Sequence, residues 1–182
     1  EHGYLPELVI KGDRTVPEFG GGLCQIGTTT FRAALKSGLP ITKRQNHSFR
    51  VRYYDPPGMD ATIYDPAPDF RFKNDTGNYI LFTAAIEGDQ LAFRFYGTRD
   101  GRVTKVPDRA TILSTTPSGP VRYIPSPDLA PGEKKLVEKP APGGKTTFTY
   151  EVTYPDGQVN KQVFTSEYRP WAETWLVGAT TT

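Results

Sequence analysis

The sequence predicts an α+β fold for its first part, with one main helix packed on a mainly antiparallel sheet, and a small all-β domain for the rest. The first part holds one amphipathic helical stretch among short segments in which polar and apolar residues alternate. The second part, beyond about Gly101, loses helical periodicity and contains neither histidine nor cysteine. We therefore expect two domains, residues 1–100 and 104–182, with a turn near Thr98 to Arg102 between them.

The one long helix is expected from about Cys24 to Ser37. Its buried face is formed by residues at positions i, i+4, i+7 and i+11, namely Cys24, Thr28, Phe31 and Leu35. Gly38 follows as the C-terminal stop, and Pro40 does not continue the helix.

Strands are expected where polar and apolar residues alternate between turn signals. In the first part these segments are His47–Tyr54, residues 61–63, residues 70–73, and a hairpin of Tyr79–Ile86 with Gln90–Tyr96. In the second part Lys145–Tyr154 and Gln158–Glu167 flank a Pro-Asp-Gly turn, and residues 175–178 form a terminal strand. No helix is expected in the second part.

Composition excludes several classes of protein. A net charge of +2 without a dense cluster of basic residues argues against nucleic-acid binding. No apolar run approaches the roughly 20 residues of a membrane span. A single cysteine forms no internal disulfide, and one Cys with two distant His falls short of a zinc site. No phosphate-binding glycine motif occurs, so we expect neither metal nor cofactor. The chain opens at Glu1 without Met, and we expect a piece of a longer protein.

The lone cysteine stands where a glycine-rich loop becomes the helix. Gly20, Gly21 and Gly22 precede it, and the positive end of the helix dipole favours the thiolate form of Cys24. His47 is the candidate base, whereas His2 is incidental. In the other interpretation, Cys24 is a small buried residue that packs at the start of a helix.

The sequence leaves open which residue orients His47 and which group binds the oxyanion. If two strands pair through a turn near Pro57, Asp65 faces His47 and Asp60 lies by the turn. Geometry therefore favours Asp65, and Asp60 remains the alternative. Backbone N–H groups around Gly22, or Gln25, are candidates for binding a developing oxyanion, although Gln25 could simply begin the helix.

Several strings of the first part resemble the VanW family, named for a gene of vancomycin-resistance clusters. Across roughly residues 3–98 the matching strings are Gly20 to Gln25, Thr28 to Phe31, Ser37 to Pro40, Asn46 to Ser48, Gly58 to Ile63 and Asp69 to Asn74. The resemblance implies a bacterial cell-envelope setting at the cell surface or outside the cell. It does not imply an established reaction. The order of Cys24, His47 and Asp65 also resembles the layout of transglutaminase and papain-like cysteine enzymes.

The second part resembles a G-five domain, a small β module proposed to bind N-acetylglucosamine. The matching features lie within residues 104–180 and include Leu129 to Gly132, Lys139 to Gly144 and Trp175 to Thr180. Its aromatic residues are either core residues or platforms for stacking on sugar rings. The candidates are Tyr150, Tyr154, Tyr168, Trp171 and Trp175.

Two functions remain open at this point. In the first, Cys24 attacks a carbonyl of a peptidoglycan stem peptide, and the acyl group passes to water or to an amine. In the second, the protein is a non-catalytic module that binds peptidoglycan or acts as a scaffold.

Overall fold

The computed structural model describes residues 3, 5–11 and 14–179, and His2 therefore lies outside the described residues. These residues form strands joined by turns, one α-helix, α1 (Leu23–Lys36), and one 3₁₀ turn, η1 (Arg52–Tyr54). The strands of the first part are β1 (Pro6–Lys11), β2 (Arg14–Phe19), β3 (Ile41–Lys43), β4 (Arg71–Phe72), β5 (Ile80–Glu87) and β6 (Gln90–Gly97). Those of the second part are β7 (Val103–Lys105), β8 (Thr111–Thr116), β9 (Arg122–Ser126), β10 (Lys134–Glu138), β11 (Gly143–Thr153), β12 (Val159–Tyr168) and β13 (Thr174–Gly178).

The elements with the clearest sequence patterns are confirmed. Helix α1 starts one residue before the predicted boundary and ends one residue before it. The hairpins β5–β6 and β11–β12 and the terminal strand β13 lie where alternation predicted them. The described residues of the second part contain no helix. Strands β1 and β2, which form a hairpin ahead of α1, were not predicted.

The segment from His47 to Ile63 differs from the prediction, because it contains no strand. Its backbone groups bond mostly to side chains instead of to a neighbouring strand. The N–H of His47 donates to Asp60, and the N–H of Ala61 donates to Thr28. Alternation predicted a sheet here, but the backbone groups are satisfied without one. The transglutaminase or papain-like layout, which needs these strands, is not confirmed.

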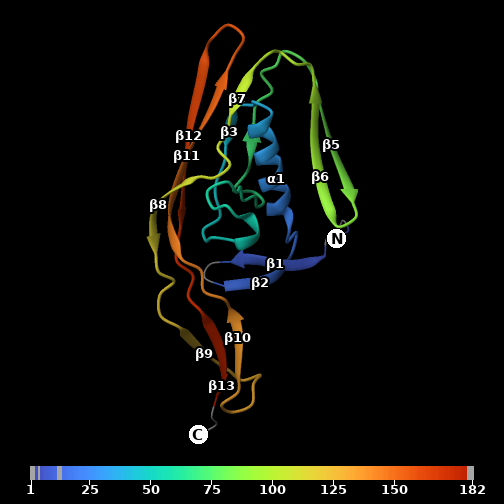
Figure 1. The fold of residues 1–182 in the computed structure, drawn as a ribbon. Helices are drawn as coiled ribbons and strands as arrows, with labels where there is room; N and C mark the ends of the chain where they lie inside the picture. The colour runs from blue at the N-terminus through green and yellow to red at the C-terminus, as the bar shows by residue number, and fades with distance from the viewer. Residues whose placement is uncertain (1–2, 4, 12–13, 180–182) are drawn as a thin grey trace.

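The longest sheet lies along one side of the molecule (Figure 1). Strand β11 pairs antiparallel with β12 on one edge, and with β7 and β8 at successive positions on the other. A second sheet has the order β10-β13-β9, in which β13 and β9 run parallel. Figure 1 shows this second sheet extending away from α1 at the end of the molecule that holds the C-terminus.

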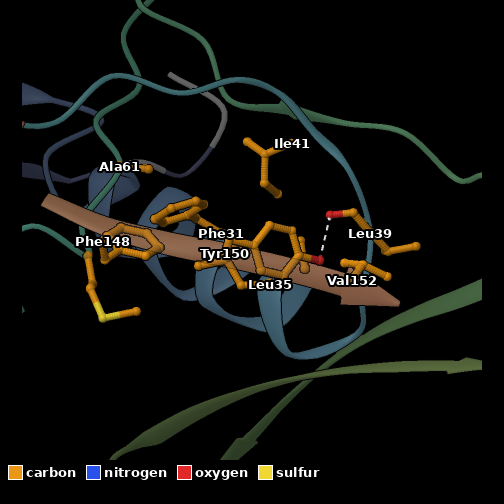
Figure 2. Packing of buried hydrophobic residues seen from close by; sticks show 10 residues of the cluster. Phe31, Leu35, Leu39, Ile41, Ala61, Phe148, Tyr150 and Val152 are labelled. Carbon is orange, nitrogen blue, oxygen red and sulfur yellow. Dashed lines mark hydrogen bonds between the residues drawn. The ribbon is translucent and has the colours of Figure 1, made fainter. Parts of the chain in front are cut away.

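The main hydrophobic core joins the two parts of the chain. Helix α1 packs against strand β11, so the sheet beneath the helix comes from the second part (Figure 2). Phe31 of the helix also contacts Phe164 of β12 edge to face, with ring centroids 5.6 Å apart. The fully buried members of this core include Phe31, Leu35, Leu39, Tyr150 and Val152. Strands of the first part contribute as well, because Phe72 of β4, Ile80 of β5 and Phe95 of β6 pack against the same core. We had expected the helix to pack on a sheet of the first part, and the structure shows that the second part also supplies strands to this core.

The connection near residues 98–107 is anchored to both parts. The Arg102 guanidinium, 8% exposed, bonds to Asp75 and to the carbonyl of Gly38, and it lies over the ring of Tyr154. Val106 packs against the main core. Arg102 and Val106 therefore connect this segment to both parts of the chain, although several of its other residues are exposed.

Candidate active site

Cys24 lies in the first turn of α1, as its sequence position predicted. Gly22 caps the helix with φ of 88°, a left-handed backbone conformation that residues other than glycine rarely adopt. The thiol is partly buried, and its sulfur lies 3.3 Å from the Thr62 hydroxyl and 3.4 Å from the carbonyl oxygen of Ile63. The cysteine is therefore held at the helix start by a segment about 40 residues further along the chain.

One face of α1 positions this segment. Residues at i, i+4 and i+8 of the helix are Cys24, Thr28 and Arg32. The Thr28 hydroxyl donates to the carbonyl of Ala61 and accepts from its N–H, both at 3.0 Å. Arg32 Nε donates to the Met59 carbonyl at 2.8 Å. These three contacts fix the chain from Met59 to Ile63 against the helix.

The imidazole of His47 is buried and oriented by Asp60. Asp60 Oδ2 lies 2.6 Å from His47 Nδ1 and also accepts the backbone N–H of His47 at 2.8 Å. Because a carboxylate only accepts, Nδ1 carries the proton, and Nε2 is the ring nitrogen left for the thiol. The ring stacks on Tyr54, with centroids 4.8 Å apart.

The cysteine and the histidine shift each other's pKa. Burial opposes ionisation of the Cys24 thiol, but hydrogen bonds with His47 and Thr62 outweigh it and lower the pKa to about 7. Burial also opposes the charged form of His47, yet the hydrogen bonds with Asp60 and Cys24 raise its pKa to about 9. At pH values between these two, the shifts favour a thiolate on Cys24 and an imidazolium on His47.

The geometric preference for Asp65 as the partner of His47 is wrong. Asp60 is 3% exposed, and hydrogen bonds with His47 hold its pKa below the ordinary value despite burial. Asp65 is exposed and lies at the wall of the pocket. The inference failed because it assumed two paired strands. Without them, the chain brings Asp60 directly beside His47.

A pocket of about 370 Å³ opens onto the sulfur. Cys24, His47 and the glycines Gly20 to Gly22 are among its lining residues. Most of the remaining wall is aromatic or aliphatic, from Val9, Phe19, Val51, Tyr53, Tyr54, Ile63 and Tyr64. Asp65 is the only carboxylate in the lining, which includes no lysine or arginine among the described residues. An apolar pocket with few polar groups around a reactive side chain is typical of a small-molecule or peptide site.

The other predicted site residues divide between the pocket and the interior. Gly22 lines the pocket. Gln25 is exposed and does not line it, and its backbone N–H already donates to the Gly22 carbonyl at 2.9 Å. Gln25 is therefore a poor candidate for binding an oxyanion in the pocket, and the backbone N–H of Cys24 in the first helical turn is a better one.

The predicted sugar-stacking residues of the second part are mostly buried. Tyr150, Tyr168 and Trp171 are at most 8% exposed, and such rings have no open face for a sugar. Tyr154 and Trp175 are half-buried. Tyr154 lies under Arg102, and Trp175 Nε1 donates to Glu173 at 2.6 Å. Of the described aromatic residues of the second part, Tyr123 is the most open, at 59% exposed.

The sequence inspection missed four groups that hold the site together. They are Arg32, Arg44, Thr62 and Tyr168, and each bonds to the segment from Tyr54 to Ile63 or to the Cys24 sulfur. Arg32 had a detectable signal, because it lies one helical turn beyond Thr28 on the face that carries Cys24. Arg44 and Tyr168 had none, since their contacts depend on the tertiary fold.

The comparisons with known proteins match two stretches of the chain. The family model described as VanW like protein matches residues 1–96. The chain belongs to the VanW-like family. The model of the G5 domain matches residues 111–179. We call these stretches the VanW region and the G5 region. Together they indicate a protein associated with the bacterial cell wall.

A relative from Bacillus subtilis (strain 168), the uncharacterized protein YoaR, is 36% identical over 102 residues. The match covers 55% of this chain and 33% of YoaR, so the chain spans about a third of that relative. Within the described residues no helix is long and apolar enough to cross a bilayer. Those residues also contain no group of three or more His, Cys, Asp or Glu side chains placed to hold a metal ion.

Proposed function

We propose that this chain is a thiol-dependent acyl-transfer enzyme of the bacterial cell envelope and that it acts on the stem peptides of peptidoglycan. The observation that carries the proposal is the connected set of Cys24, His47 and Asp60 at a helix start beside an open pocket. Asp60 lies within hydrogen-bond distance of His47, and interactions between Cys24 and His47 shift their pKa values toward the thiolate and the imidazolium, which supports nucleophilic catalysis.

In the proposed reaction, the Cys24 thiolate attacks the carbonyl carbon of a peptide bond. The oxyanion that forms accepts hydrogen bonds from first-turn N–H groups of α1. The His47 imidazolium then gives its Nε2 proton to the leaving amine, and the C–N bond breaks to leave a thioester. Neutral His47 next takes a proton from water or from an acceptor amine, which attacks the thioester and releases the thiolate. Water gives a peptidase and an amine gives a transpeptidase.

A non-catalytic role in wall binding is the second candidate, and the G5 match favours it. The two proposals differ at Cys24, because a binding module does not need a thiolate. Both place the protein at the cell wall, outside the cytoplasm.

The deciding experiment is incubation of the protein with purified peptidoglycan and with isolated muropeptides, followed by mass spectrometry. We expect a change in the muropeptide pattern and an acylated Cys24 peptide, both lost in Cys24→Ala and His47→Ala. Asp89→Asn is the matched control, since Asp89 is an exposed aspartate in the turn between β5 and β6 and does not line the pocket. Retention on peptidoglycan without any Cys24-dependent product over a range of stem peptides would favour the binding module.

A further inference from the structure

The last residues of strand β12 lie directly against the chain that carries Asp60. Ser166 and Tyr168 point to the same side of the strand, two residues apart, and both are buried. They belong to the G5 region, whereas Cys24, His47 and Asp60 belong to the VanW region. Next to them, Asn46 Nδ2 donates to the Glu167 carbonyl at 2.9 Å. The G5 region thus forms part of the wall behind the candidate active site.

The direction of the hydrogen bonds at Tyr168 is fixed by chemistry. Its hydroxyl oxygen accepts the backbone N–H of Gly58 at 2.7 Å, and its own proton goes to Asp60 Oδ1. Burial and the charge of Asp60 raise the pKa of Tyr168, so the hydroxyl keeps this proton over the physiological range. Gly58 has φ of 97°, and a Cβ there would come within 2.5 Å of Thr146 Oγ1 on β11. The loop before Asp60 therefore sits closely on the G5-region sheet.

Asp60 divides its two oxygen atoms between the two regions. Oδ2 serves the backbone and the ring of His47. Oδ1 accepts from Tyr168 and lies 3.4 Å from Arg44 Nη2. Arg44 is itself held by Ser166, with Nη1 2.8 Å from the Ser166 hydroxyl. The carboxylate cannot rotate without breaking contacts on the side of β12.

We propose that Tyr168 is a positioning residue of the catalytic centre, and that the G5 region thereby completes the Cys24–His47–Asp60 site. This inference rests on the proposed function. Tyr168 touches neither the thiol nor the substrate pocket, and it acts only through Asp60. By holding Oδ1, it keeps Oδ2 in line with Nδ1 of His47 and so keeps Nε2 directed at the sulfur. The charged or titratable groups around Asp60 that bear on this arrangement are His47, Arg32, Arg44, Tyr54 and Tyr168.

The test is the pH profile of Cys24 alkylation by iodoacetamide in the full chain. In Tyr168→Phe, which removes one oxygen atom, we expect the apparent pKa of the thiol to rise by about one unit. Alkylation at pH 6 then becomes about threefold slower, because a roughly tenfold loss of thiolate is partly offset by the higher nucleophilicity of the more basic thiolate. Tyr150→Phe is the matched control. Its hydroxyl is also buried and also bonds across the two regions, to the Leu39 carbonyl at 3.1 Å, yet it does not contact the site. It should leave the profile unchanged.

A double-mutant cycle separates positioning from general loosening of the fold. Asp60→Asn alone should shift the profile at least as far as Tyr168→Phe, and adding Tyr168→Phe to Asp60→Asn should cause no further shift. An unchanged profile in Tyr168→Phe overturns the proposal, as does a shift that persists in the Asp60→Asn background. If Tyr168→Phe does not fold, Ser166→Ala decides, since freeing Arg44 should produce a smaller shift in the same direction, and no shift overturns the proposal.

This assay follows the thiol and not a product. If Tyr168→Phe shifts the alkylation profile of Cys24 but the wild-type protein changes no muropeptide, only the proposed function is refuted. A protein in which muropeptides change but Tyr168→Phe behaves like Tyr150→Phe would refute only the positioning role.

Discussion

Two groups of strands in the G5 region differ in how far their apolar side chains are buried. Strands β11 and β12 bury one face against α1, where Phe148, Tyr150 and Val152 are at most 4% exposed. The β9-β10-β13 sheet extends away from the helix and leaves apolar side chains such as Tyr123 and Leu136 at least 38% exposed. We call these the inner strands and the outer sheet.

The comparison shows that a boundary between family regions need not be a boundary in packing. The inner strands form much of the core beneath the helix of the VanW region, and Tyr168 at the end of β12 bonds to Asp60. The outer sheet neither packs under the helix nor contacts Asp60. We therefore expect the inner strands to control stability and thiol chemistry, and the outer sheet to be available for contact with the wall.

The largest expected effect is on stability. Phe148→Ala should lower the free energy of unfolding by about 3–5 kcal/mol, because it removes a large buried ring from the shared core. Leu136→Ala in the outer sheet should cost at most about 1 kcal/mol, since its side chain is already partly in water. Urea denaturation followed by tryptophan fluorescence measures both. Equal losses in the two variants would contradict the division.

The next effect concerns the reactivity of Cys24. With a pKa of about 7 in place of 9.0, the thiol carries roughly 100-fold more thiolate at pH 6. A less basic thiolate is a weaker nucleophile, which reduces the expected gain in alkylation rate to about tenfold. His47→Ala should abolish this gain.

The same pair predicts the pH dependence of the proposed reaction. Activity should rise through about pH 7 as the thiolate forms, and it should fall through about pH 9 as the imidazolium loses the proton needed by the leaving amine. Leu136→Ala should keep this profile. A thiol that is alkylated only after unfolding would instead identify Cys24 as a core residue.

Limited proteolysis tests the joint between the regions. Trypsin should cut after Lys134 or Lys135 about tenfold faster than after Arg102 or Lys105, because cleavage follows local opening and Arg102 is tied into the core. Time-resolved mass spectrometry of the fragments gives the order of the cuts. A first cut within residues 98–107 that releases two stable halves would restore the picture of separate domains.

The smallest expected effect is on binding to the wall. If the outer sheet contacts glycan, Tyr123→Ala should reduce retention on purified peptidoglycan about three- to tenfold, the range that one aromatic contact provides. Tyr79→Ala, which removes a 98% exposed tyrosine from the VanW region, is the control. Neither variant should alter alkylation of Cys24. Equal retention of both variants would show that Tyr123 does not contact the wall.

The sequence specified the local elements well. The helix at Cys24 and the hairpins around residues 88–89 and 155–157 follow from periodicity and turn residues, which act over a few positions. The prediction failed at His47–Ile63, where alternating residues imitate a strand. There the backbone bonds to Thr28, Arg44 and Asp60, and no local pattern shows such partners.

The sequence by itself determined that the lone cysteine, Cys24, follows three glycines at the start of a helix and that His47 follows it in the chain. The tertiary structure decided which aspartate serves that histidine and where the supporting sheet comes from. Asp60 rather than Asp65 meets His47, and Tyr168 meets Asp60 across 108 residues of chain. Contacts at such separations depend on how the whole core packs. The helix needed apolar strands to cover its buried face, and these come from both regions: β11 and β12 from the G5 region, and β4 to β6 from the VanW region.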